Sequence, residues 1–368
     1  MMVKYKIMHK NDVVAETQGL TVTRLIKPGL CPVMVKEGSS ITQWIALRSV
    51  DMHRSSSRHL FNALRLTADA TVEDKIRAGH AVTIEDNWWI QREDEDCSYE
   101  KLKAYNKVAA DIATGMAQHG IIDKDGYTEL GTVGSFEKAW RKIDGTWYLH
   151  KKGDIAELLS EYFSYNFLKS MGVDVAEYSL YRYTPRSGIE RAMVLSKDFT
   201  LGGRYDFEPF VCYFGENEDY GYILKELGKM ESIISGISEN YVRMCFFDGL
   251  LNNGDRHNGN AGFLRDSNDG KLVSLAPLYD FNQALIAIDG DLKMTENRKG
   301  YMGHLMANMP TQYIKGLAFN KEAVTEAVKD AQANTLKSFP DNGMACELCG
   351  QYIKDAFQMF SKFCEMSI

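Results

Sequence analysis

The segment Phe246 to Asn282 reads FFDGLLNNGDRHNGNAGFLRDSNDGKLVSLAPLYDFN and decides how the rest of the chain is interpreted. It begins apolar, passes through a polar run from Asn252 to Asn260, and ends after a second apolar run. This pattern predicts a buried scaffold that presents a polar loop. Asp255, Asn260 and Asp280 are then expected to meet at the ends of short strands. Carboxylate and amide oxygens are the ligands that hard divalent cations prefer.

The spacing of these three residues matches the needs of phosphoryl transfer. A carboxylate orients the attacking hydroxyl, while an amide oxygen and a second carboxylate hold Mg²⁺. In protein kinases an Asp precedes the Asn by five positions, and a later Asp-Phe-Gly supplies the other metal ligand. Here Asp255 precedes Asn260 by five positions, and Asp280-Phe281-Asn282 follows. The usual kinase order places Arg and His before the Asp, whereas Arg256 and His257 follow it.

That order, Asp-Arg-His-x-x-Asn with Ala-Pro-x-Tyr-Asp-Phe downstream, resembles the HipA-like serine/threonine kinases of bacterial toxin–antitoxin modules. The resemblance covers Gly131 to Asn282 by motif. It implies an α+β, two-lobed protein-kinase-like fold with a strand-rich N-lobe, a helical C-lobe and an extra N-terminal α/β module. The expected domains are residues 1–120, 121–200 and 201–368. The resemblance also implies ATP and Mg²⁺ as cofactors, a protein substrate and an antitoxin-type protein partner.

A second informative segment, LGTVGSFEKAW, runs from Leu130 to Trp140 and precedes a strand ending in His-Lys-Lys. Glycines allow backbone N–H groups to approach phosphate oxygens, so Gly134 and Ser135 are candidate nucleotide-binding residues. A simple hairpin is the alternative interpretation. Lys151 best matches the strand lysine of the resembled family, with Lys152 as the alternative, because alternation along a strand lets one of the two face a cleft.

The remaining site residues come from the resemblance. Glu161, on a predicted helix near 155–171, would hold the strand lysine, with a solvent-facing glutamate as the alternative. The segment 193–197 would connect the lobes and bind adenine, which nominates Leu195, Ser196 and Lys197. His257 is a further nucleotide-site candidate, and it is expected to brace the loop together with Arg256. Thr132 and Ser135 are candidate self-phosphorylation sites.

Composition limits the other function classes. The chain has 368 residues, of which 45% are hydrophobic, with a net charge of −7, so direct nucleic-acid binding is not expected. No signal peptide and no membrane-length apolar run is apparent, which predicts a cytoplasmic protein. Seven scattered cysteines do not form a disulfide framework. Cys346 and Cys349 are interpreted as a helix-packing pair, because a structural zinc site needs four ligands.

The first 120 residues show local patterns without a motif. Alternation predicts short strands near 3–8, 13–17 and 20–26, and Trp88-Trp89 should place one ring on each face of a strand. Helical patterns are expected over 41–66 and 99–119. The basic, hydroxyl-rich run 54–59, RSSSRH, could bind a phosphate or a partner, but a solvated helix start is the favoured interpretation.

Two other function classes remain open. A pseudokinase or nucleotide sensor would bind ATP and Mg²⁺ without turnover. A metal-dependent phosphoesterase could use carboxylate, imidazole and amide ligands without nucleotide. Its ligand set would be Asp255, His257, Asn258, Asn260 and Asp280. The phosphoesterase interpretation gives no reason for the upstream series of Gly134, Lys151 and Glu161.

Overall fold

The computed structural model describes residues 3–50, 52, 54–123, 125–134, 136–184, 188, 190–287 and 320–366. These residues form two compact units. Unit 1 comprises Met1–Lys152, Leu195–Glu208 and Phe263–Val273, and unit 2 comprises Gly153–Val194, Pro209–Gly262 and Ser274–Ile368. The domain ranges expected from the sequence stay predictions. No helix among the described residues is both long and apolar enough to span a membrane.

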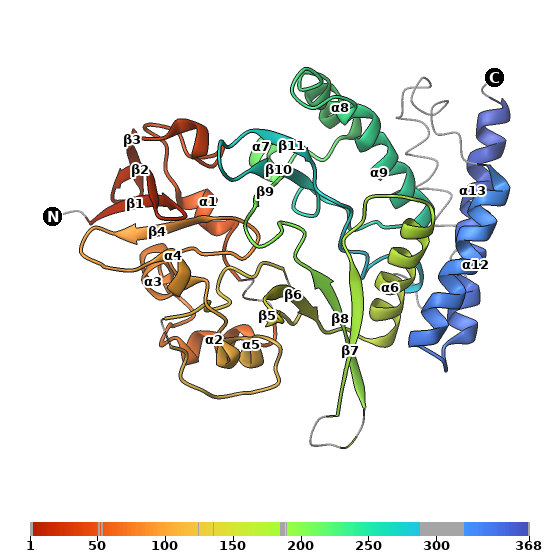
Figure 1. The fold of residues 1–368 in the computed structure, drawn as a ribbon, viewed down its shortest axis with the longest axis horizontal. Helices are drawn as coiled ribbons and strands as arrows, with labels where there is room; N and C mark the ends of the chain where they lie inside the picture. Colours follow the sequence, from red (N-terminus) through yellow and green to blue (C-terminus); the bar gives the residue numbers. More distant parts are fainter. Residues whose placement is uncertain are drawn as a thin grey trace. The chain divides into compact units, whose positions relative to one another are not determined.

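Unit 1 is built on short strands and helices, as the alternating amino-terminal pattern predicts (Figure 1). Its elements are β1 (Lys4–His9), β2 (Asp12–Gln18), β3 (Thr21–Leu25), η1 (Pro28–Leu30), α1 (Thr42–Ala46), α2 (Ser57–Ala63), α3 (Val72–Gly79), β4 (Trp88–Arg92), α4 (Tyr99–Leu102), α5 (Lys107–Ala113), β5 (Lys138–Ile143) and β6 (Thr146–Lys151). One sheet has the order β3-β2-β1-β4, with antiparallel pairings. Strands β5 and β6 form an antiparallel hairpin.

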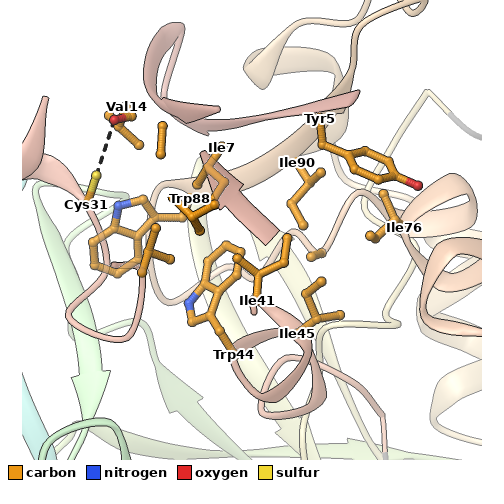
Figure 2. Close-up of a cluster of buried hydrophobic side chains, with 14 residues drawn as sticks. Tyr5, Ile7, Val14, Cys31, Ile41, Trp44, Ile45, Ile76, Trp88 and Ile90 are labelled. Atoms are coloured by element: carbon orange, nitrogen blue, oxygen red, sulfur yellow. Dashed lines mark hydrogen bonds between the residues drawn. The ribbon is translucent and has the colours of Figure 1, made fainter. Parts of the chain in front are cut away.

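Strand β4 carries the two tryptophans to opposite faces, which confirms the prediction from alternation. Both side chains are 1% exposed. Trp88 packs in a cluster with Ile7 and Trp44 (Figure 2), and its indole N–H donates to a backbone carbonyl at 2.8 Å. Trp89 belongs to a separate cluster that includes Trp140 and Trp147. One strand therefore joins two hydrophobic cores of unit 1.

The two long helical patterns expected in unit 1 were wrong in extent. Residues 41–66 form the two short helices α1 and α2, and 99–119 form α4 and α5. Asn106 explains the second break, because its extended backbone and its side chain cap the N-terminus of α5 by accepting the N–H of Ala109. A residue that caps a new helix ends the continuous hydrogen-bond ladder before it.

Unit 2 is mainly helical. Its elements are α6 (Ile155–Ser170), β7 (Tyr178–Tyr183), α7 (Val211–Phe214), α8 (Tyr220–Gly228), α9 (Ile237–Leu251), η2 (Leu285–Ala287), α12 (Lys321–Ser338) and α13 (Gly343–Met366). Strands β8 (Arg191–Lys197), β9 (Tyr205–Pro209), β10 (Gly262–Asp266) and β11 (Leu272–Leu275) are divided between the units, and the last three have the order β11-β10-β9. Cys346 and Cys349 are fully buried in α13, which confirms their packing role.

Helix α6 begins at a capping box formed by Asp154 and Glu157. It packs on α12, which also contacts α13. Aromatic pairs fill this core, with ring centroids 6.3 Å apart for Phe167 and Phe247. The core holds α9, whose C-terminal end leads directly into the polar loop.

Candidate functional site

Arg256 organises the polar loop of unit 2. Its Nε and Nη2 donate to the two carboxylate oxygens of Asp248, at 2.9 and 3.1 Å. Its Nη1 donates to the backbone carbonyl of Tyr279 at 2.8 Å and to the carbonyl of Asn260. The guanidinium carbon also lies 5.3 Å from the ring centroid of Phe281. One buried side chain thus ties the 255–260 loop to the 279–281 segment.

The Asp248 partner was not predicted from the sequence. It lies in α9 and is fully buried, and it also accepts the side-chain N–H of Asn253 at 2.8 Å. The available signal was one carboxylate inside the apolar run FFDGLL, because buried charges in proteins are paired. Burial alone would lower the pKa of Arg256, but the Asp248 carboxylate outweighs it and raises that pKa. The guanidinium therefore stays charged.

The loop itself is shaped by its own polar groups. Helix α9 ends where Asn252 adopts a left-handed backbone with φ 49°. The Asn260 side chain donates its Nδ2 hydrogen to the carbonyl of Asp255 at 3.0 Å. Because the amide nitrogen is used in this way, the amide oxygen is the atom that Asn260 can offer a cation. Asp255 itself is exposed.

Hydrogen bonds of Asp280 and of the residue before it fix the backbone at Asp280. Its backbone has φ 65°, a region that Asp tolerates better than most residues. Its N–H donates to the Tyr178 hydroxyl at 3.1 Å, and the neighbouring Tyr279 hydroxyl donates to the carbonyl of Gly259 at 3.0 Å. Unit 2 therefore brings together the segments that carry Asp255, Asn260 and Asp280, as the sequence predicts.

His257 and Asn258 have different surroundings from the other polar residues. His257 is exposed, and its Nδ1 accepts the N–H of Gly259 at 2.9 Å, so it braces its own loop as expected. Asn258 is buried, and its side-chain amide donates to the carbonyls of Gly215 and Asn217 at 2.8 and 2.9 Å. Asn258 therefore anchors the 255–260 loop to the segment 215–217.

Unit 1 places Lys151 in a buried setting. Lys151 is 5% exposed near the end of β6, and the β5–β6 register sets it directly opposite Lys138. Directly paired residues share a face of the sheet, so two buried lysines lie on one face.

The Lys138 charge also acts on Glu85, a carboxyl group of unit 1. Burial raises the pKa of Glu85 to about 7, although the charge of Lys138 opposes this rise. The sequence interpretation missed Lys138, whose signal was a lysine soon after the Gly-x-x-Gly.

Lys152, the alternative strand lysine, is engaged elsewhere. Its ammonium group donates to a carboxylate oxygen of Glu137 at 2.9 Å. Glu161, on α6, is 1% exposed, so the solvent-facing alternative is wrong. The pairing of Lys151 with Glu161 stays a prediction.

The other nominated residues lie as follows. Leu195 and Ser196 are buried at the end of β8, and Lys197 is half-buried. Gly134 has a φ of 104°, and a Cβ built there would lie 2.5 Å from the Lys138 ammonium nitrogen. Ser135 lies outside the described residues.

Comparison with protein families gives one decisive match. The model described as HipA-like C-terminal domain matches residues 101–339, more than half of the chain. The chain belongs to the HipA-like C-terminal domain family. This confirms the resemblance drawn from the Asp255 to Asp280 motif.

This HipA-like chain is similar in sequence to the serine/threonine-protein kinase CtkA of Helicobacter pylori (strain J99). It is 32% identical over 140 residues, which cover 34% of this chain and 40% of the relative. The match thus spans less than half of that kinase. The crystal structure of the H. pylori proinflammatory kinase CtkA covers 63% of this chain and 95% of its own, with a TM-score of 0.41 and 21% identity.

A structural neighbour shows the fold of the HipA-like chain more fully. A chain of the Shewanella oneidensis MR-1 toxin–antitoxin complex of HipA, HipB and operator DNA covers 98% of both chains, with a TM-score of 0.64 and 12% identity. The fold is therefore mixed α/β with antiparallel pairings, similar to that structure. The two-lobed arrangement stays a prediction.

Proposed function

We propose that this HipA-like chain is an ATP-dependent protein kinase that transfers the γ-phosphate of ATP to a serine or threonine hydroxyl. In this proposal Asp255 orients the hydroxyl and accepts its proton, and Asn260 and Asp280 hold Mg²⁺. Lys151 contacts the α- and β-phosphates, with Glu161 as its partner. The backbone at Leu195, Ser196 and Lys197 binds adenine. Bound Mg²⁺ would supply neutralisation of the charge that develops on the phosphates.

The observation that carries the proposal is the double anchoring by Arg256. It fixes the backbone of Asn260 and Tyr279 through one guanidinium, so the two proposed Mg²⁺ ligands belong to one local structure. Phosphoryl transfer depends on positioning and charge stabilisation more than on covalent chemistry. A buried charged brace is suited to that need, because a fork of several hydrogen bonds restricts both segments at once.

The donor set fits a hard cation. Asn260 presents an amide oxygen, since its nitrogen is bound to the Asp255 carbonyl, and Asp280 presents a carboxylate. Mg²⁺ keeps several waters and needs few protein oxygens when phosphates are also present. The phosphoesterase alternative gives no role to the upstream residues Gly134, Lys151 and Glu161, whereas the kinase proposal uses all three, which favours the kinase.

The test is phosphate transfer by matched variants. The full chain is incubated with ATP and Mg²⁺, and phosphorylation of the chain and of added protein substrate is followed by mass spectrometry. We expect transfer by the wild type and its loss in D255N and D280N. The control is D341N, an exposed aspartate in the turn between α12 and α13, which should transfer normally. Retained transfer in D255N or D280N would overturn those role assignments.

A thermal shift assay with nucleotide separates the alternatives, because a ligand that binds the folded state raises the melting temperature. ATP and Mg²⁺ stabilise both a kinase and a nucleotide sensor, but only the kinase also transfers phosphate. A phosphoesterase would be stabilised by the metal alone and would hydrolyse an aryl phosphate.

An antitoxin-type protein is the proposed partner, by analogy with the Shewanella complex of HipA and HipB. Purification of the tagged chain with the products of its neighbouring genes tests this. A stoichiometric small protein that co-purifies with the chain is expected, and the absence of one from these preparations would count against it.

A further inference from the structure

The run Arg54 to His59 does lead into a helix, as predicted, but its first residue is buried and not solvated. Arg54 is 2% exposed, and Ser56 and Ser57 are also buried. The α2 helix begins at Ser57, so Arg54 precedes it and points into unit 1. The favoured sequence interpretation was therefore right about the helix start and wrong about the solvation of Arg54. A buried arginine needs partners, because an uncompensated buried charge is costly.

Arg54 donates to backbone carbonyls in the segment 129–140, and we call the described residues of this segment, which leave out Ser135, the glycine loop. Its Nη2 donates to the carbonyls of Thr132 at 2.6 Å and Gly134 at 2.8 Å. Its Nε donates to Gly134 at 3.1 Å, and its Nη1 donates to the Lys138 carbonyl at 3.2 Å. One guanidinium thus collects three carbonyls from a segment about 80 positions away in the sequence.

The glycine loop is also closed from its own ends. The Glu129 carboxyl accepts the N–H of Trp140 at 2.9 Å and the Thr132 hydroxyl at 2.5 Å. Glu129 itself has φ 63°, a region that non-glycine residues seldom adopt. Outside the loop, the Ser55 hydroxyl donates to Glu137 at 2.6 Å. Ser55, the residue next to Arg54, therefore also takes part in holding the loop.

The hydrogen bonds to Arg54 fix the direction in which backbone C=O and N–H groups of the loop point. A phosphate is repelled by carbonyl oxygens and bound by N–H groups. In a planar trans peptide the C=O and the following N–H point in opposite directions, and the described residues contain no cis peptide. The Thr132 carbonyl faces Arg54, so the Val133 N–H points away from it, and Val133 is 43% exposed. Arg54 thus holds the Thr132 carbonyl on its own side of the loop and leaves the Val133 N–H on the opposite side.

We propose that Arg54 is the positioning residue of the glycine loop, and that it sets the loop backbone for the phosphate groups of a nucleotide without touching the nucleotide itself. The inference rests on the proposed kinase function. It also gives the amino-terminal part of the chain a task in nucleotide binding. A lysine cannot replace Arg54, because a single ammonium group lacks the fork that reaches three carbonyls.

The test compares ligands that differ only in phosphate content. Dissociation constants of ATP with Mg²⁺, of ADP and of adenosine are measured by calorimetry for the wild type, R54K, R54A and R58A. Arg58 is exposed in α2 and provides the matched control. We expect R54K and R54A to weaken ATP and ADP binding at least tenfold, while adenosine binding changes less than twofold. R58A should resemble the wild type for all three ligands.

Each outcome has a distinct meaning. R54K keeps the positive charge and serves as the readout if R54A does not fold. Equal weakening of ATP and adenosine would indicate general damage to unit 1 and would overturn the positioning role. Unchanged ATP affinity in R54K would overturn it as well. Absence of ATP binding by the wild type would instead refute the proposed function, and the inference with it.

Discussion

Replacing Arg256 by alanine removes one half of a buried ion pair and leaves the other half in place. Asp248 is fully buried and would lose two charge-assisted hydrogen bonds, of 2.9 and 3.1 Å. The carbonyls of Asn260 and Tyr279 would lose their shared donor. Breaking a buried pair by removing one partner costs about 3 to 5 kcal/mol. We therefore expect R256A to lower the free energy of unfolding by about 4 kcal/mol.

Urea denaturation followed by circular dichroism measures this change, and two further variants test its cause. The double variant D248L/R256M leaves no unpaired charge, so it should be more stable than R256A. K229A breaks the surface pair between Lys229 and Glu226 at the C-terminal end of α8 and should cost less than about 1 kcal/mol. If R256A costs no more than K229A, or if D248L/R256M is the less stable of the two, the ion pair does not organise the loop.

Three further predictions concern other parts of the chain. Burial raises the pKa of Glu129 to about 8, against the opposing effects of its hydrogen bonds from Thr132 and Trp140 and of the Arg54 charge. The folded state binds this proton more tightly than the unfolded state. The stability of the wild type should therefore fall as pH rises from about 4.5 to about 8 and then level off. The melting temperature of E129Q should fall less across this window, and an equal fall in both proteins would count against the assignment. G131A should destabilise unit 1 and weaken ATP binding, because a Cβ at Gly131 would lie 1.9 Å from the Val82 carbonyl oxygen; G228A, with nothing within 4 Å of its Cβ, should change the melting temperature little, and similar values for both would contradict this. D154A removes the cap of α6 and should cost about 1 kcal/mol in urea denaturation; no loss would show that the capping box is not needed.

Local patterns in the sequence predicted much of the fold. The periodic segment 155–171 became α6, and alternation predicted β1 to β3 within two residues. The polar loop between apolar runs predicted that Asp255, Asn260 and Asp280 belong to one place. These features depend on neighbours in the sequence or on a motif with fixed spacing, so one chain is enough to recognise them.

Features that depend on long-range partners were missed. The basic run at Arg54 looks solvated because its partners, the carbonyls of the glycine loop, carry no side-chain signal. Asp248 was missed for a different reason: its carboxylate stands out in an apolar run, but the run does not show that Arg256, eight positions away across a helix end, is its partner. Backbone carbonyls are present at every residue, so no sequence pattern marks the ones that will accept a buried guanidinium.

The position of strand β4 has a consequence for anyone who shortens this chain. The family match begins at residue 101, yet Trp140 and Trp147, which lie inside the match, pack against Met8 and Trp89, which lie before it. A polypeptide started at residue 101 would leave two indole rings facing water. We expect it to aggregate, and the boundary drawn by similarity is therefore not a place at which to cut.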